Sequence, residues 1–79
     1  MRVRLFAGAA DAAGTEETQL TGPMELGELR RRLEESHGPE FARVLGLCSL
    51  LVDGTRTDQD AAVIGEDATV DVLPPFAGG

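Results

Sequence analysis

The strongest constraint on the fold of this chain is a single long amphipathic helix pattern, which spans Pro23 to about His37. Three leucines within it, Leu26, Leu29 and Leu33, are spaced three and four residues apart and form one apolar stripe. Charged Arg and Glu side chains cover the rest of the helix. Since a helix with one stripe must bury that stripe, one face of a β-sheet is enough to cover it. The pattern therefore predicts one main helix packed on a sheet.

The boundaries of this helix and of two shorter ones have their own signals. Pro23 is tolerated at the first helical position, and Gly38-Pro39 is a stop signal. A short helix is predicted over residues 8–13, ending at Gly14. A second is predicted over residues 40–45, and Gly46 ends it.

The sheet is predicted from alternating apolar residues, which are clearest near the two ends of the chain. Over residues 2–7, one face carries Val3, Leu5 and Ala7, and the other carries Arg2, Arg4 and Phe6. Residues 69–73 alternate in the same way, and we expect the first and last strands to lie side by side in the centre. Further strands are predicted at 15–21, near an edge, at 48–52, which the Asp53-Gly54 turn closes, and at 55–57. Val63 and Ile64 are expected to pack before a turn at residues 65–67.

Together these elements predict the fold class α+β. The order of strands and helices describes a ubiquitin-like β-grasp, a mixed sheet of four to five strands packed on one main helix. We expect the domain to span residues 1–73 and to be followed by an extended, flexible C-terminal tail of residues 74–79.

Composition narrows the functions that are open to the chain. Its 79 residues suit one domain, and 14 acidic against 7 basic residues give a formal net charge of −7. Nucleic-acid binding is disfavoured because phosphates require a basic surface, whereas docking on a basic enzyme surface is favoured. All seven basic residues are Arg, so the chain offers no side-chain amine for conjugation to its own kind. With no signal peptide and no long apolar run, the cytoplasm is expected and a membrane partner is not.

Groups that could carry out catalysis are scarce. His37 is interpreted as a helix cap or surface residue, and Cys48, which begins an apolar strand, as a small buried thiol. One Cys and one His supply too few ligands for a zinc site. We therefore expect no bound metal or cofactor.

The final residues, Gly78 and Gly79, are the strongest functional signal. Glycine has no side chain, so this end can enter a channel too narrow for other residues and present the Gly79 carboxylate inside another protein. Pro74 and Pro75 stiffen the base of the tail. Phe76 is expected to act as an aromatic anchor for a partner, and the alternative is that it folds back on the sheet of its own chain.

Three stretches of the chain resemble the MoaD/ThiS family of sulfur carriers. These are Val3-Arg4-Leu5-Phe6-Ala7, the Ala13-Gly14 step and the Pro-Pro-x-x-Gly-Gly ending. Within that family the small subunits of molybdopterin synthase are the most similar. In one departure, the family's Leu-x-x-Gly-Asp turn is replaced by Val63-Ile64-Gly65-Glu66-Asp67.

The resemblance implies that the chain is a substrate and subunit of partner enzymes rather than an enzyme. A ubiquitin-activating-like adenylyltransferase would consume ATP to adenylate the Gly79 carboxylate, and a sulfur donor would convert it to a thiocarboxylate. A sulfur-accepting enzyme, such as the large subunit of molybdopterin synthase, would then take the sulfur for molybdopterin, the organic part of the molybdenum cofactor. The candidate partner-binding residues are Gly78, Ala77, Phe76, Pro75, Pro74 and Phe6.

Other functions share parts of this pattern. The same chemistry at Gly79 could supply sulfur to thiamine, cysteine or a secondary metabolite. A ubiquitin-like protein modifier would instead join Gly79 to lysines of other proteins. The third class is a non-catalytic β-grasp interaction module, whose function would survive an added residue after Gly79.

Overall fold

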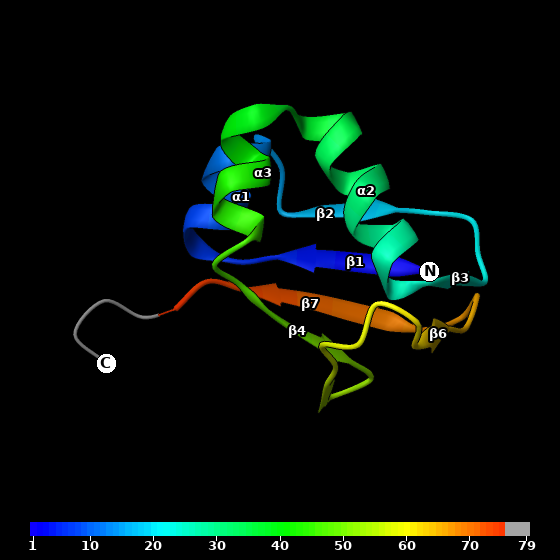
Figure 1. Ribbon diagram of the computed structural model, residues 1–79. Coiled ribbons are helices and arrows are strands. Elements are labelled where there is room, and N and C mark those ends of the chain that lie inside the picture. The colour runs from blue at the N-terminus through cyan, green and yellow to red at the C-terminus, as the bar shows by residue number, and fades with distance from the viewer. Residues whose placement is uncertain (76–79) are drawn as a thin grey trace.

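The computed structural model describes residues 1–75, which form a five-stranded mixed sheet and three helices (Figure 1). The strand order in the sheet is β2-β1-β7-β4-β5. The strands are β1 (Arg2–Leu5), β2 (Glu17–Gln19), β4 (Ser49–Val52), β5 (Thr55–Arg56) and β7 (Thr69–Leu73). A separate pair is formed by β3 (Met24–Glu25) and β6 (Val63–Ile64). The predicted α+β class and β-grasp sheet are confirmed.

The first and last strands lie side by side in the middle of the sheet, as their patterns predicted. β1 is parallel to β7, with Arg2 opposite Thr69 and Leu5 opposite Val72. On its other edge β7 is antiparallel to β4. β2 forms one edge, as expected, and β5 forms the other after the Asp53-Gly54 turn.

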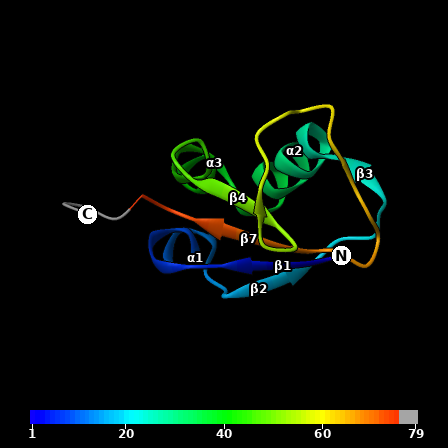
Figure 2. The ribbon, with the colours of Figure 1, turned by 90° about the horizontal axis from the view of Figure 1, so that it is seen from below.

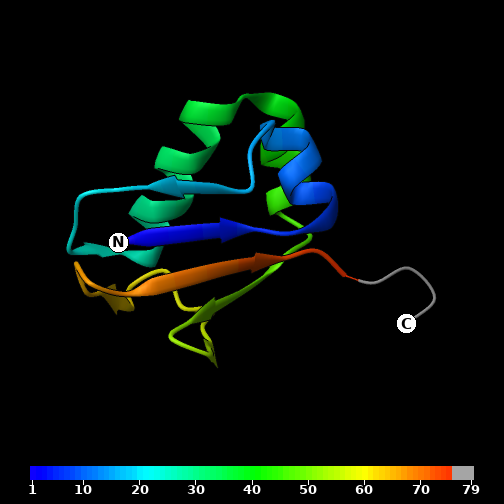
Figure 3. The same cartoon turned by 180° about the vertical axis from the view of Figure 1, so that it is seen from behind.

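Three helices cover one face of this sheet: α1 (Ala7–Ala13), α2 (Leu26–His37) and α3 (Pro39–Leu45). Figure 2 shows α2 and α3 from below, and Figure 3 shows the sheet from its other face, with β2 in front of α2. The leucine stripe of α2 is fully buried, and α3 adds Phe41 and Leu45 to the core. The rest of the core comes from Val3, Leu5, Ala9, Leu50, Ile64, Ala68, Val70 and Val72.

Glycine follows the end of all three helices, as the sequence predicted: Gly14 after α1, Gly38 after α2 and Gly46 after α3. Gly14, at φ 77° and ψ 14°, donates its backbone N–H to the carbonyl of Ala10 at 2.9 Å. Gly38, at φ 89° and ψ 179°, separates α2 from α3. Within residues 1–75, no helix is long and apolar enough to cross a membrane.

The predicted start of the main helix at Pro23 is wrong by three residues. Met24 and Glu25 instead form β3, which is antiparallel to β6. The first two backbone amides of α2 bond to a loop that is distant in the sequence. The Leu26 N–H donates to the Ala62 carbonyl at 2.8 Å, and the Gly27 N–H donates to the Asp60 carbonyl at 3.0 Å. These tertiary contacts set the first turn of the helix.

Two predicted core positions are also wrong. The first strand ends at Leu5, and Ala7 is exposed because its φ of 50° turns the chain into α1. Val63 is 72% exposed, whereas its neighbour Ile64 is buried, because the two alternate across β6. The turn that follows closes through a bond from Ala68 N–H to the Gly65 carbonyl at 3.1 Å.

Candidate functional site

The described chain ends two residues beyond β7, the middle strand of the sheet. β7 is hydrogen-bonded to β1 on one edge and to β4 on the other, and it ends at Leu73. Pro74 is half-buried and Pro75 is exposed. Proline has no N–H to continue the ladder, so pairing stops here. The N-terminus lies at the opposite end of the sheet (Figures 1 and 3).

Four of the predicted site residues, Phe76, Ala77, Gly78 and Gly79, lie outside the described residues. The others are placed together at the exit of the chain from β7. Phe6 follows the last pair of the β1–β7 ladder, and its N–H donates to the Val72 carbonyl at 3.2 Å. The Phe6 side chain is 38% exposed. The structure therefore sets an exposed aromatic ring beside the base of the predicted tail.

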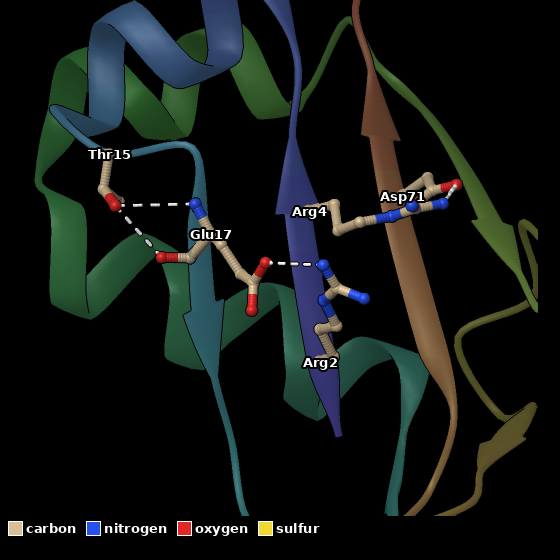
Figure 4. A network of polar contacts seen from close by, with 5 residues as sticks. All are labelled: Arg2, Arg4, Thr15, Glu17 and Asp71. Carbon is tan, nitrogen blue, oxygen red and sulfur yellow. Dashed lines mark hydrogen bonds and ion pairs between the residues drawn. The ribbon is translucent and has the colours of Figure 1, made fainter.

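An ion pair on the outer face of the sheet fixes the surroundings of Phe6. The guanidinium of Arg4 donates from Nε and Nη2 to both carboxylate oxygens of Asp71, at 2.6 and 2.8 Å (Figure 4). The central carbon of the same guanidinium lies 5.8 Å from the centre of the Phe6 ring, within cation–π range. The hydrogen bond to Asp71 raises the pKa of Arg4. Arg4 thus links the central strand to the exposed ring.

A second set of contacts holds the edge strand in place beside this group. Arg2 forms an ion pair with Glu17 at 2.9 Å, and Thr15 Oγ1 donates to the Glu17 carbonyl at 3.0 Å (Figure 4). Between β1, β2 and α1 the surface has an open hollow of about 410 Å³. It is lined by Arg4, Leu5, Phe6, Ala7, Ala10, Glu16 and Glu17. The hollow is thus a recess next to Phe6.

The sequence pointed to Phe6 as a candidate, which stays a prediction, and gave no sign of the pairing of Arg4 with Asp71. Alternation places Arg4 on the outer face, and it places Asp71 on the outer face of its own strand. The pair could be found only once β1 and β7 were known to be neighbours in parallel register, with these residues opposite each other.

The two other reactive residues take structural positions. His37 is in the last turn of α2, and its ring centre lies 5.0 Å from that of Phe41. Cys48 is half-buried rather than fully buried, and its thiol donates to the Val44 carbonyl at 3.2 Å. Burial raises the pKa of Cys48, and the nearby charge of Arg30 opposes the shift. Among residues 1–75, no group of three or more His, Cys, Asp or Glu side chains is placed to hold a metal.

The sequence of residues 3–79 matches the family model described as the ThiS family. The chain belongs to the ThiS family. The match continues through the Gly-Gly end, so it covers the domain and the residues beyond the described part. The predicted MoaD/ThiS resemblance is confirmed, and it places the chain among small sulfur-carrier and ubiquitin-like proteins.

Solved structures show the same fold as this ThiS-family chain. SAMP1 from Haloferax volcanii has a TM-score of 0.79 and 24% identity, covering 100% of this chain and 98% of that one. A chain in the complex of subunits 1 and 2 of the molybdopterin-converting factor from Helicobacter pylori has a TM-score of 0.74 and 24% identity. The match covers 99% of this chain and 96% of that one. A putative molybdopterin converting factor subunit 1 from Pyrococcus furiosus has a TM-score of 0.77 and 20% identity, covering 95% of each chain. No curated protein matches the chain in sequence.

Proposed function

We propose that the chain carries sulfur on its C-terminus for molybdopterin biosynthesis. An activating partner adenylates the Gly79 carboxylate with ATP, a sulfur donor converts the adenylate to a thiocarboxylate, and a sulfur-accepting enzyme removes the sulfur. The observation that carries this proposal is the ThiS-family match, which extends through Gly79. The chain itself supplies the acyl group and the docking surface, and the partners supply the ATP site and the catalytic residues.

The chemistry explains why the carboxylate needs a partner. A carboxylate is a poor acyl donor because oxide is a poor leaving group. When a carboxylate oxygen attacks the α-phosphate of ATP, pyrophosphate leaves and an acyl-adenylate forms. Sulfide (HS⁻) from the donor then attacks the acyl carbon, the carbon–oxygen bond to AMP breaks, AMP leaves, and the thioacid loses its proton to give the thiocarboxylate. A thiocarboxylate is ionised near neutral pH, and its sulfur is nucleophilic as thiolates are.

The described part of the structure suits this role. A central strand paired on both edges gives the tail of residues 74–79 a rigid base, so a partner that binds the domain also places the tail. Phe6, Pro74 and Pro75 provide apolar contact at that base, and the hollow beside Phe6 admits a partner side chain. The net charge of −7 favours a basic partner surface.

Molybdopterin is the proposed destination of the sulfur for two reasons. The opening and the Pro-Pro pair resemble small subunits of molybdopterin synthase, and two similar structures are described as parts of molybdopterin converting factors. One of these is a complex of subunits 1 and 2 from Helicobacter pylori. By analogy we propose a large-subunit partner that binds the face around Phe6 and receives the tail.

The first test is intact-mass spectrometry of the protein with a free C-terminus. The protein is incubated with ATP, a sulfide source and a ubiquitin-activating-like enzyme from the same genome. We expect a mass gain equal to the replacement of one oxygen by sulfur. Deletion of Gly79, or addition of one alanine after it, should abolish the gain, whereas Val63→Ala should preserve it. An unmodified wild-type protein, with the enzyme active on a known carrier, would overturn the proposal.

A ubiquitin-like modifier is the second candidate, because SAMP1, a small archaeal modifier protein, is among the similar structures. The two functions share activation and differ in the acceptor. A modifier forms amide bonds between Gly79 and lysines of other proteins, and a carrier accumulates as the free thioacid. Digestion with chymotrypsin, which cleaves after Phe76, followed by mass spectrometry of cell extracts for Ala-Gly-Gly remnants on lysine, separates them.

A further inference from the structure

The hollow between β1, β2 and α1 combines apolar and charged lining residues. The apolar ones are Leu5, Phe6, Ala7 and Ala10, and the charged ones are Arg4, Glu16 and Glu17. Leu5 is buried, whereas Phe6 and both glutamates are exposed. The hollow is therefore open to another molecule and offers it both kinds of contact.

The charges in the hollow do not cancel. Arg4 is paired with Asp71, which is not part of the lining, and Glu17 is paired with Arg2 (Figure 4). Glu16 forms no ion pair within residues 1–75. One negative charge of the lining is thus left without a counter-charge, and it belongs to Glu16.

The backbone holds Glu16 in this place. Its carbonyl accepts a hydrogen bond from the Leu5 N–H at 2.8 Å, which extends the pairing of β1 and β2 one step beyond Arg4 and Glu17. Beside it, Thr15 Oγ1 donates to the Glu17 carbonyl at 3.0 Å. The Glu16 carboxylate is therefore presented from a paired segment and not from a free loop.

Ala7, also in the lining, has an unusual backbone conformation. Its φ of 50° lies in the left-handed region that alanine rarely adopts. The other non-glycine residue with positive φ within residues 1–75 is Asp53, which lies in a hairpin turn. At Ala7 the chain turns from β1 into α1, and the hollow lies between these two elements. Because backbone strain is most often found at functional sites, it supports a binding role for the hollow.

The hollow lies at the end of the molecule from which the predicted tail extends. Phe6, in its lining, donates its N–H to the Val72 carbonyl near the end of β7. A second hollow, of about 270 Å³, is lined in part by Met1 and Glu66 and lies at the opposite end of the sheet (Figure 1). A partner that reaches Gly79 therefore meets the first hollow and not the second.

We propose that the hollow binds an arginine side chain of the partner that activates Gly79. The aliphatic part of an arginine suits the apolar lining, and its planar guanidinium can pair with the Glu16 carboxylate and stack on the Phe6 ring. Glu16 then selects a basic partner residue at the base of the tail. This inference rests on the proposed function, because it concerns the partner that adenylates Gly79.

The first experiment tests the preference of the hollow without any enzyme. The isotope-labelled protein is titrated with N-acetyl-arginine methylamide at constant ionic strength, and its backbone amides are followed by NMR. N-acetyl-citrulline methylamide, which has nearly the same shape and no charge, is the control probe. We expect the arginine probe alone to shift the amides of the lining residues. Glu16→Gln should abolish these shifts, and Glu66→Gln, which removes the same charge from the second hollow, should preserve them.

The proposal is overturned if the lining amides do not shift, if citrulline shifts them equally, or if Glu16→Gln leaves the shifts unchanged. The second experiment measures binding to the activating enzyme from the same genome by surface plasmon resonance. We expect Glu16→Gln to raise the dissociation rate constant about fivefold, the upper range for an exposed ion pair. Glu66→Gln should leave that constant unchanged, and equal constants for the two variants would contradict the proposal. If only the proposed function fails, no thiocarboxylate forms while the arginine-specific shifts remain, so the two failures are distinguishable.

Discussion

Phe6 is the residue in the described part of the site that is best placed to bind a partner. It is exposed, lies beside the end of β7 and is contacted by Arg4, which Asp71 holds with two hydrogen bonds. An aromatic side chain with few rotatable bonds, fixed in this way, loses little conformational freedom when it is covered by a partner. It therefore has the properties of an interface anchor.

We expect Phe6→Ala to weaken binding of the activating enzyme by about 2 kcal/mol, the scale of an interface hot spot. Val63→Ala is the control, because Val63 is also exposed but lies on β6, away from the chain exit. Isothermal titration calorimetry measures both affinities. Equal affinities of the two variants would remove Phe6 from the interface.

At the scale of elements, the junction between α2 and α3 depends on one glycine. Gly38 has φ 89° and ψ 179°, a conformation that is almost confined to glycine. Its N–H donates to Glu34 and its carbonyl accepts from Ala42, at 2.9 and 3.0 Å, so the residue joins both helices. The junction turns α3 so that Phe41 and Leu45 reach the core.

We expect Gly38→Ala to lower the free energy of unfolding by about 2 kcal/mol, because alanine is strained in this conformation. Gly8→Ala is the matched control. Gly8 lies within α1, and a Cβ added there meets nothing within 4 Å, so this change should raise stability by about 0.5–1 kcal/mol. Thermal unfolding measures both. If the two variants shifted in the same direction, the strain at Gly38 would not control the junction.

A helix or strand can be predicted from the sequence when the pattern that specifies it lies within the element itself, and it cannot when it depends on pairing with a distant segment. The leucine stripe and the alternation of β7 repeat within a few residues, so the helix, the strand and their buried faces could be predicted. β3 could not, because its two residues become a strand only by pairing with β6, about forty positions away. The Arg4–Asp71 pair likewise joins residues far apart in the chain. The Gly-Gly end could be singled out from the sequence because its proposed role depends only on the residue type and its position in the chain, and on no contact with the rest of the fold.

At the scale of the whole molecule, we expect the described domain to be stable without the predicted tail. The buried core lies between Val3 and Val72, and no core residue follows β7 within residues 1–75. We expect deletion of Gly79 to leave the thermal unfolding midpoint unchanged within about 1 °C, because a terminal glycine buries little surface. The same deletion should abolish thiocarboxylate formation. Differential scanning calorimetry checks the first outcome, and a lowered midpoint would show that Gly79 contributes to the fold.

The parallel arrangement of β1 and β7 also determines how the protein responds to a pulling force. The chain enters the sheet at the start of β1 and leaves it at the end of β7, at opposite ends of the same ladder. Tension between the two termini therefore slides one strand along the other and loads all their hydrogen bonds at once, whereas a hairpin pulled from its open end would unzip one bond at a time. Force applied to the last residues therefore acts on a strand whose pairing with β1 resists it in shear.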